Sequence, residues 1–187
     1  MYAKHNTEAI VLGSRSLQEA DGMYQLYTRM FGMVHARAVS VREERSRLRY
    51  SLPHYARAEV SLVRGKAGWR IAGCTPVSSL KGAQMEVFAR VARLVERLVR
   101  GEEHNEYLFH SLAEAHTRLL EKDVRTETVE LVCAARVLFA LGYIAAPSLN
   151  TSLFSHTAYD VAHLEEADVF REEILVSINR AIVEAQL

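Results

Sequence analysis

The arginines between residues 42 and 57 are the side chains whose type and spacing most clearly point to a chemistry. Five arginines stand in this stretch, together with Tyr50, His54 and Tyr55. Guanidinium groups bind phosphate oxygens, and aromatic rings stack on unpaired bases. The stretch therefore predicts contact with a nucleic acid, and a solvated charged loop is the alternative. Tyr50, Tyr55 and Trp69 are candidate stacking residues, although Tyr55 and Trp69 equally suit a protein core.

Charge is divided unequally along the chain, although the formal net charge is zero. Residues 1–80 hold twelve Lys and Arg and six Asp and Glu, a formal charge of +6, and the remainder carries −6. This asymmetry favours a polyanion-binding surface on one part of the chain only. The residues expected to contact the nucleic acid are Arg37, Arg42, Arg45, Arg47, Arg49, Tyr50, Arg57 and Lys66.

A second set of arginines, Arg90, Arg93, Arg97 and Arg100, recurs at intervals of three and four beside an apolar stripe. Guanidinium groups next to apolar surface suit an acidic peptide that ends in a hydrophobic residue and a free carboxylate. These four residues are therefore the predicted partner-binding site. The alternative is a solvated helix face whose arginines make only weak surface ion pairs.

Catalytic and metal-binding signatures are scarce. Glu106, His110 and Glu114 share one helix face, a spacing that suits either a metal or ordinary surface pairs. Cys74 and Cys133 lie far apart in apolar segments, so both are expected to be buried free thiols. Neither a phosphate-binding glycine loop nor a nucleophile motif occurs. The sequence predicts a protein that is not an enzyme and that uses no metal or other cofactor.

The elements that must position these residues change character near Pro76. Before it, short apolar runs bounded by turn residues predict five strands and hence a small barrel or sandwich. The predicted strands cover residues 7–15, 23–30, 33–41, 55–63 and 69–75. A glycine-bearing hairpin loop over residues 64–68 joins the last two of them.

Beyond Pro76 the apolar residues recur at helical spacing. The predicted helices cover residues 85–99, 107–120 and 126–141, with one or two more over residues 159–186. The third is apolar over much of its circumference, which predicts a central position, and Gly142 is placed to cap it. The fold class is α+β, with domains over residues 1–78 and 79–187. No apolar run reaches membrane-spanning length and no signal peptide is recognised, so a cytoplasmic location is expected.

The order of several motifs resembles the RecO family of bacterial recombination mediators. The shared features are the strand around Ile10, the acidic pair Glu19 and Asp21, the turn from Thr28 to Gly32, the basic run with Ser46 and Arg47, the helix end LFALGY and the terminal INRAIVEAQL. Two departures stand out. Many members carry a four-cysteine zinc module where residues 148–158 contain no cysteine, and many have glycine at the position of Ser40.

The resemblance implies a five-stranded oligonucleotide-binding (OB) barrel followed by an all-helical domain. It further implies binding to single- and double-stranded DNA without sequence specificity, strand annealing and recombinase loading. The implied partners are RecR and the tail of single-stranded-DNA-binding protein, in the bacterial cytoplasm at the nucleoid. The alternative function is a protein–protein adaptor with a degenerate barrel that does not bind DNA. A metal-dependent enzyme that uses the region of His110 is a more distant alternative.

Overall fold

The structure is a computed structural model that describes residues 3–17, 19–41, 43, 46, 48, 50–145 and 151–185. The chain forms two compact units. The first comprises Met1–Leu80 and Arg100–His104, and the second comprises Lys81–Val99 and Asn105–Leu187.

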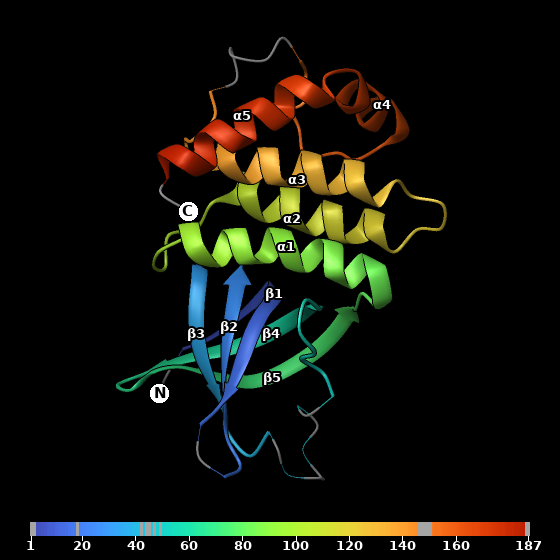
Figure 1. Ribbon diagram of the computed structural model, residues 1–187. Coiled ribbons are helices and arrows are strands. Elements are labelled where there is room, and N and C mark those ends of the chain that lie inside the picture. The colour runs from blue at the N-terminus through green and yellow to red at the C-terminus, as the bar shows by residue number, and fades with distance from the viewer. Residues whose placement is uncertain are drawn as a thin grey trace. The chain divides into compact units, whose positions relative to one another are not determined.

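The first unit is a closed barrel (Figure 1). Its strands are β1 (Lys4–Ser16), β2 (Gly22–Thr28), β3 (Gly32–Ala38), β4 (Arg57–Gly65) and β5 (Gly68–Ser78). They are hydrogen-bonded in the order β1-β2-β3-β5-β4, and antiparallel pairing of β4 with β1 closes the ring. Strands β3 and β5 meet in a short parallel pairing. The predicted five-stranded barrel is therefore confirmed.

The interior of the barrel is filled by alternate residues of each strand. In β3, Val34, Ala36 and Ala38 are buried in the core cluster, whereas His35 and Arg37 are exposed. This alternation is the period of two that a half-buried strand produces. Trp69 belongs to the same buried cluster, so of its two interpretations the structure favours a core residue.

The bounds of all five strands differ from the predicted ranges by one to three residues, and two of the differences have a clear backbone reason. Strand β4 begins at Arg57 because Tyr55 has a φ of 61°, which an extended strand does not accommodate. Strand β5 continues through Pro76 to Ser78. Proline lacks an N–H for the ladder, and here it pairs with Ala58 beside a register irregularity, where that loss is tolerated.

The second unit consists of helices α1 (Gly82–Leu98), α2 (Glu106–Leu119), α3 (Thr126–Ala140), α4 (Val161–Val169) and α5 (Arg171–Glu184). Helix α3 contacts each of the other four helices, which confirms its predicted central position (Figure 1). Gly142 follows α3 with a φ of 81°, and the N–H of Tyr143 donates to the carbonyl of Leu138 at 2.8 Å. This geometry is the predicted glycine cap. Within the described residues, no helix is both long and apolar enough to span a membrane.

Candidate nucleic-acid interface

Three arginines from distant parts of the sequence form a row across the outside of the barrel. The strand register places Arg15 of β1 opposite Met23 of β2, and Met23 opposite Arg37 of β3. Arg37 is in turn the pairing partner of Arg70 of β5. Directly paired residues project from the same face of a sheet. Arg15, Arg37 and Arg70 are all exposed, and we call them the arginine row.

A depression lies beside the arginine row. The next pairs in register are Gly13 with Gln25 and Gln25 with His35. Gly13 contributes no side chain, and the surface here contains a depression with a volume of about 400 Å³. The residues lining this depression are Gly13, Ser14, Arg15, Met23, Gln25 and His35. The depression therefore brings the Gln25 amide and the His35 imidazole, two groups that can form hydrogen bonds, close to Arg15.

Arg37 is held in place by Asp21. The Arg37 Nε donates to Asp21 Oδ2 at 2.6 Å, and the Ser40 N–H donates to Asp21 Oδ1 at 2.8 Å. The hydrogen bond from Ser40 and then that from Arg37 lower the pKa of Asp21. Ser40 has a φ of 52°, in the left-handed region that favours glycine. Glycine is the residue that many members of the family that the chain resembles have at this position. The Arg37 side chain is nevertheless 44% exposed, so it is oriented and still accessible.

The other predicted DNA contacts differ in their surroundings. Arg57 pairs with Glu8, and its side chain is only 17% exposed, so its guanidinium already has a carboxylate partner. Lys66 is exposed between the paired ends of β4 and β5, and Tyr50 is exposed as well. The remaining four, Arg42, Arg45, Arg47 and Arg49, lie outside the described residues.

The predicted partner-binding arginines are separated by the end of helix α1. Arg93 and Arg97 border a depression of about 310 Å³ on the helical unit. Its lining residues are Arg90, Arg93, Leu94, Arg97 and Ile182. Two apolar side chains thus lie among guanidinium groups, as the peptide-docking prediction requires. Arg100 lies beyond the end of α1 and belongs to the Arg100–His104 segment of the first unit, so it is not on this helix face.

Arg90 differs from Arg93 and Arg97 because it is tied to the neighbouring helix. Its Nε and Nη2 donate to the two carboxylate oxygens of Glu130 on α3, at 2.5 and 2.6 Å. The hydrogen bond with Glu130 raises the pKa of Arg90. A bidentate pair of this kind fixes a side chain as well as neutralising it. Arg93 and Arg97 are therefore the better candidates for binding an external carboxylate.

The histidine and the cysteines considered for catalysis and metal binding lie in separate surroundings. His110 Nε2 lies 3.6 Å from Glu106 Oε1, as a surface pair one helical turn apart. Among the residues that the structure describes, no group of three or more His, Cys, Asp or Glu is placed to hold a metal. Burial raises the pKa of Cys74 to about 11 and that of Cys133 to about 11. Both thiols therefore stay protonated near neutral pH and are weak nucleophiles.

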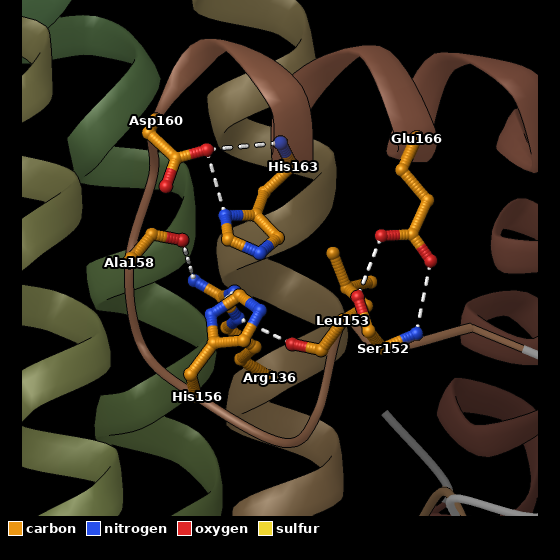
Figure 2. Close-up of polar contacts among 8 residues, drawn as sticks. All are labelled: Arg136, Ser152, Leu153, His156, Ala158, Asp160, His163 and Glu166. Atoms are coloured by element: carbon orange, nitrogen blue, oxygen red, sulfur yellow. Dashed lines mark hydrogen bonds and ion pairs between the residues drawn. The ribbon is translucent and has the colours of Figure 1, made fainter.

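Sequence reasoning missed a buried arginine in the helical unit. Arg136 of α3 is fully buried, and it donates to the carbonyls of Leu153 and Ala158, each at 2.9 Å. A third N–H points to His156 Nδ1 at 3.3 Å. Figure 2 shows the side chain extending from α3 into the segment that precedes α4. The signal was a lone arginine in an otherwise apolar stretch of helix, where a charge requires several acceptors.

A glutamate anchors the other end of the same segment. Glu166 of α4 accepts hydrogen bonds from the N–H and hydroxyl of Ser152 (Figure 2). It also accepts a hydrogen bond from the Thr151 hydroxyl. The hydrogen bond from Thr151 is the main cause of the lowered pKa of Glu166, followed by that from Ser152. Arg136 and Glu166 together fix residues 151–158, in the region where the resemblance placed a zinc module in other members. Polar side chains fix this cysteine-free segment here.

Comparison with known protein families gives a match to the part of the chain that forms the barrel. The family model described as "Recombination protein O N terminal", an OB-fold domain, matches residues 1–93. The match includes all five strands of the barrel and the first part of α1. No curated protein matches the chain. The closed five-stranded barrel and the match over its length show that the chain belongs to the RecO family, which acts in DNA recombination and repair.

Proposed function

We propose that this chain is a RecO-like mediator that binds single- and double-stranded DNA without sequence specificity and promotes strand annealing and recombinase loading. Its partners in this proposal are RecR and the tail of single-stranded-DNA-binding protein, in the bacterial cytoplasm at the nucleoid. The observation that carries the proposal is the arginine row, Arg15, Arg37 and Arg70, on the outside of an OB-type barrel. Proteins with this fold bind oligonucleotides on one face of the sheet.

The arginine row has the extent needed to contact several phosphates. Neighbouring strands lie ~4.8 Å apart, so a row from β1 through β2 and β3 to β5 spans roughly 14 Å. Guanidinium groups at this spacing neutralise phosphates and release counterions, which gives affinity that depends on salt and not on sequence. Annealing requires no catalytic group, because reducing the repulsion between two strands is sufficient for them to pair.

The test replaces Arg15, Arg37 and Arg70 together by Ala and measures binding of single-stranded DNA at several salt concentrations. The logarithmic salt slope should fall in magnitude by about 2, since each phosphate contact to a single strand contributes about 0.7. The matched control replaces three exposed lysines outside the row, Lys4, Lys81 and Lys122, by Ala. Equal losses in both variants, or an unchanged affinity in a folded row variant, would refute the proposed interface.

The neighbouring arginines extend the same proposal. Arg42, Arg45, Arg47 and Arg49 follow β3, which carries Arg37, within a few residues in the sequence. Reversing these four to Glu should weaken binding to all DNA sequences similarly. Glu43 and Glu44 are interleaved with them, so fewer than four contacts should be lost. The salt slope of this variant counts those contacts.

The depression on α1 is the proposed site for the acidic tail. The Arg93 and Arg97 guanidinium groups would bind the terminal carboxylate, and Leu94 and Ile182 would contact the terminal apolar side chain. Arg93→Glu with Arg97→Glu should abolish binding of a tail peptide while DNA affinity stays largely unchanged. Arg100→Glu, a charge reversal outside the depression, is the control. A chain that binds the peptide but no DNA would instead be an adaptor with a degenerate barrel.

A further inference from the structure

Helix α5 carries apolar residues on two opposite faces. Ile174, Ile178 and Ala181 are buried against the rest of the helical unit. Val176 and Val183 are 59% and 76% exposed. Successive residues turn by about 100° in an α-helix, so Val176 projects almost directly away from the buried face. An exposed valine on this outermost face of α5 buries little apolar surface within its own chain.

The exposed valines follow the spacing of a helix–helix seam. Val183 follows Val176 by seven residues on the same helix. Val169 is 77% exposed and precedes Val176 by seven residues, but it is the last residue of α4, a separate helix that ends before Phe170. A seven-residue apolar repeat keeps one line of side chains facing a partner helix. We call the two valines of α5, Val176 and Val183, the valine seam. The exposed polar residues on either side of it in α5 are Glu172, Glu173, Asn179 and Arg180.

We propose that the valine seam pairs antiparallel with the same seam of a second copy of this chain. With the twofold axis at Val176, Glu173 faces the partner's Arg180, and Arg180 faces the partner's Glu173. On the other side of the seam, Glu172 faces the partner's Asn179. A parallel pairing would instead bring Glu172 close to the partner's Glu172, which is repulsive. The charges of α5 therefore complement a second copy in the antiparallel direction.

The expected association is weak. Helix α5 has 14 residues and is therefore about 21 Å long. A single pair of such helices falls in the low range of interface areas, below ~1,200 Å² in total. The dimer should therefore form reversibly and only at high protein concentration. Such a dimer would carry two arginine rows, one for each strand to be annealed; this consequence rests on the proposed function, whereas the association itself does not.

Sedimentation equilibrium of the full chain over a wide concentration range tests the proposal, at a salt concentration that screens exposed charges. The wild-type chain should show a monomer–dimer equilibrium. Val176→Glu should abolish dimerisation, and Val161→Glu, at an exposed valine outside the seam, should leave it unchanged. A chain that is monomeric at every concentration would overturn the proposal, and its exposed helix face would then await a different partner.

Charge reversal distinguishes the antiparallel pairing from other contacts. At low salt, where exposed charges are not screened, Glu173→Arg and Arg180→Glu should each weaken dimerisation by about tenfold, since two symmetry-related attractive pairs become repulsive. An equimolar mixture of the two variants should regain the wild-type level, because every facing pair is again of opposite charge. Both variants are folded if mixing restores association. Variants that dimerise like the wild type, or a mixture that stays monomeric, would contradict this geometry. DNA binding by the barrel plays no part in these outcomes.

Discussion

At the scale of single residues, the least expected feature is a positive charge in the middle of the helical unit. Arg136 is fully buried, and no ion pair to it is found among the described residues. Its charge is solvated instead by two carbonyl groups, by His156 and by the Tyr159 ring, whose centre lies 4.5 Å from the guanidinium carbon. Planar guanidinium is the cationic group best suited to this combination of partners.

Replacing Arg136 by Met should destabilise the helical unit although it roughly preserves side-chain volume. The carbonyls of Leu153 and Ala158 lose their donors, so we expect a loss of about 2–5 kcal/mol in the free energy of unfolding. Arg136→Lys should also be destabilising, since one ammonium does not reproduce the fork of donors. Urea denaturation followed by circular dichroism measures the loss. A change below about 1 kcal/mol would show that the segment does not depend on Arg136.

His156 gives the helical unit a dependence on pH. Burial, then the neighbouring His163 and Arg136, lower its pKa from the ordinary value of 6.5. Arginine only donates, so His156 Nδ1 must accept and the ring must remain neutral. The unfolded chain therefore binds this proton at a higher pH than the folded chain. The resulting stability is fully present above pH 6.5 and is lost as pH falls through the lowered pKa.

Glutamine at position 156 should remove this dependence. In His156→Gln a neutral amide oxygen can still accept from Arg136, so the change in stability between neutral pH and about pH 5.5 should become smaller than in the wild type. His110→Gln, a replacement on the surface of α2, is the control and should retain the wild-type profile. The lowered pKa values of Asp160 and Glu166 act in a more acidic range. Parallel profiles for wild type and His156→Gln would contradict the assignment.

At the scale of elements, the turn between β2 and β3 explains one of the family motifs. The Thr28 hydroxyl donates to the carbonyl of Gly32 at 3.1 Å and accepts from the N–H of Phe31 at 3.0 Å. Gly32 has a φ of 63°, and a Cβ at this position would lie 2.2 Å from the carbonyl oxygen of Glu103. The threonine closes the turn, and the glycine admits both its left-handed backbone and the close approach of another backbone segment.

Gly32→Ala should therefore be among the most destabilising substitutions in the barrel. The new methyl meets backbone, which moves less readily than a side chain, so we expect a loss of about 2–4 kcal/mol on unfolding. Gly68→Ala is the control, because Gly68 also has a positive φ but a Cβ there would meet no atom within 4 Å. It should lose only the conformational part, about 1 kcal/mol. Equal losses in thermal or urea unfolding would mean that the contact with Glu103 contributes nothing.

At the scale of the whole molecule, charge rather than hydrophobicity divides the chain. The sequence has no net formal charge and an isoelectric point near 7.1, yet its first 80 residues carry a formal +6. Opposite charges on different molecules attract at low ionic strength, and a net charge near zero does not oppose their association. Light scattering at neutral pH should therefore fall as salt is added, unlike any pairing through the valine seam, which should persist. Scattering that is independent of salt would exclude this charge-driven association.

The order of strands and helices and the α+β fold class could be predicted from the amino-acid sequence alone. Short apolar runs bounded by turn residues located the strands, three- and four-residue spacing located the helices, and Gly142 marked the end of α3. These patterns are local, since they record which face of each element is buried. The order of motifs likewise indicates the RecO family without any knowledge of the fold, and the charge asymmetry predicts a polyanion-binding surface.

Which of these residues lie together could not be predicted from the sequence, because it depends on how distant segments pack in the folded chain. Arg15, Arg37 and Arg70 form one row because strand register and closure of the barrel bring them side by side, and no local pattern encodes either. The same register brings Arg57 to Glu8, so its guanidinium has a carboxylate partner that is distant in sequence. In the sequence, Arg136 is only an interruption of an apolar helix. In the folded chain, residues 153–158 supply the carbonyl groups that accept its hydrogen bonds. In each case the partners are distant in sequence, so their interaction energies are set by the folded structure and not by the spacing of residue types.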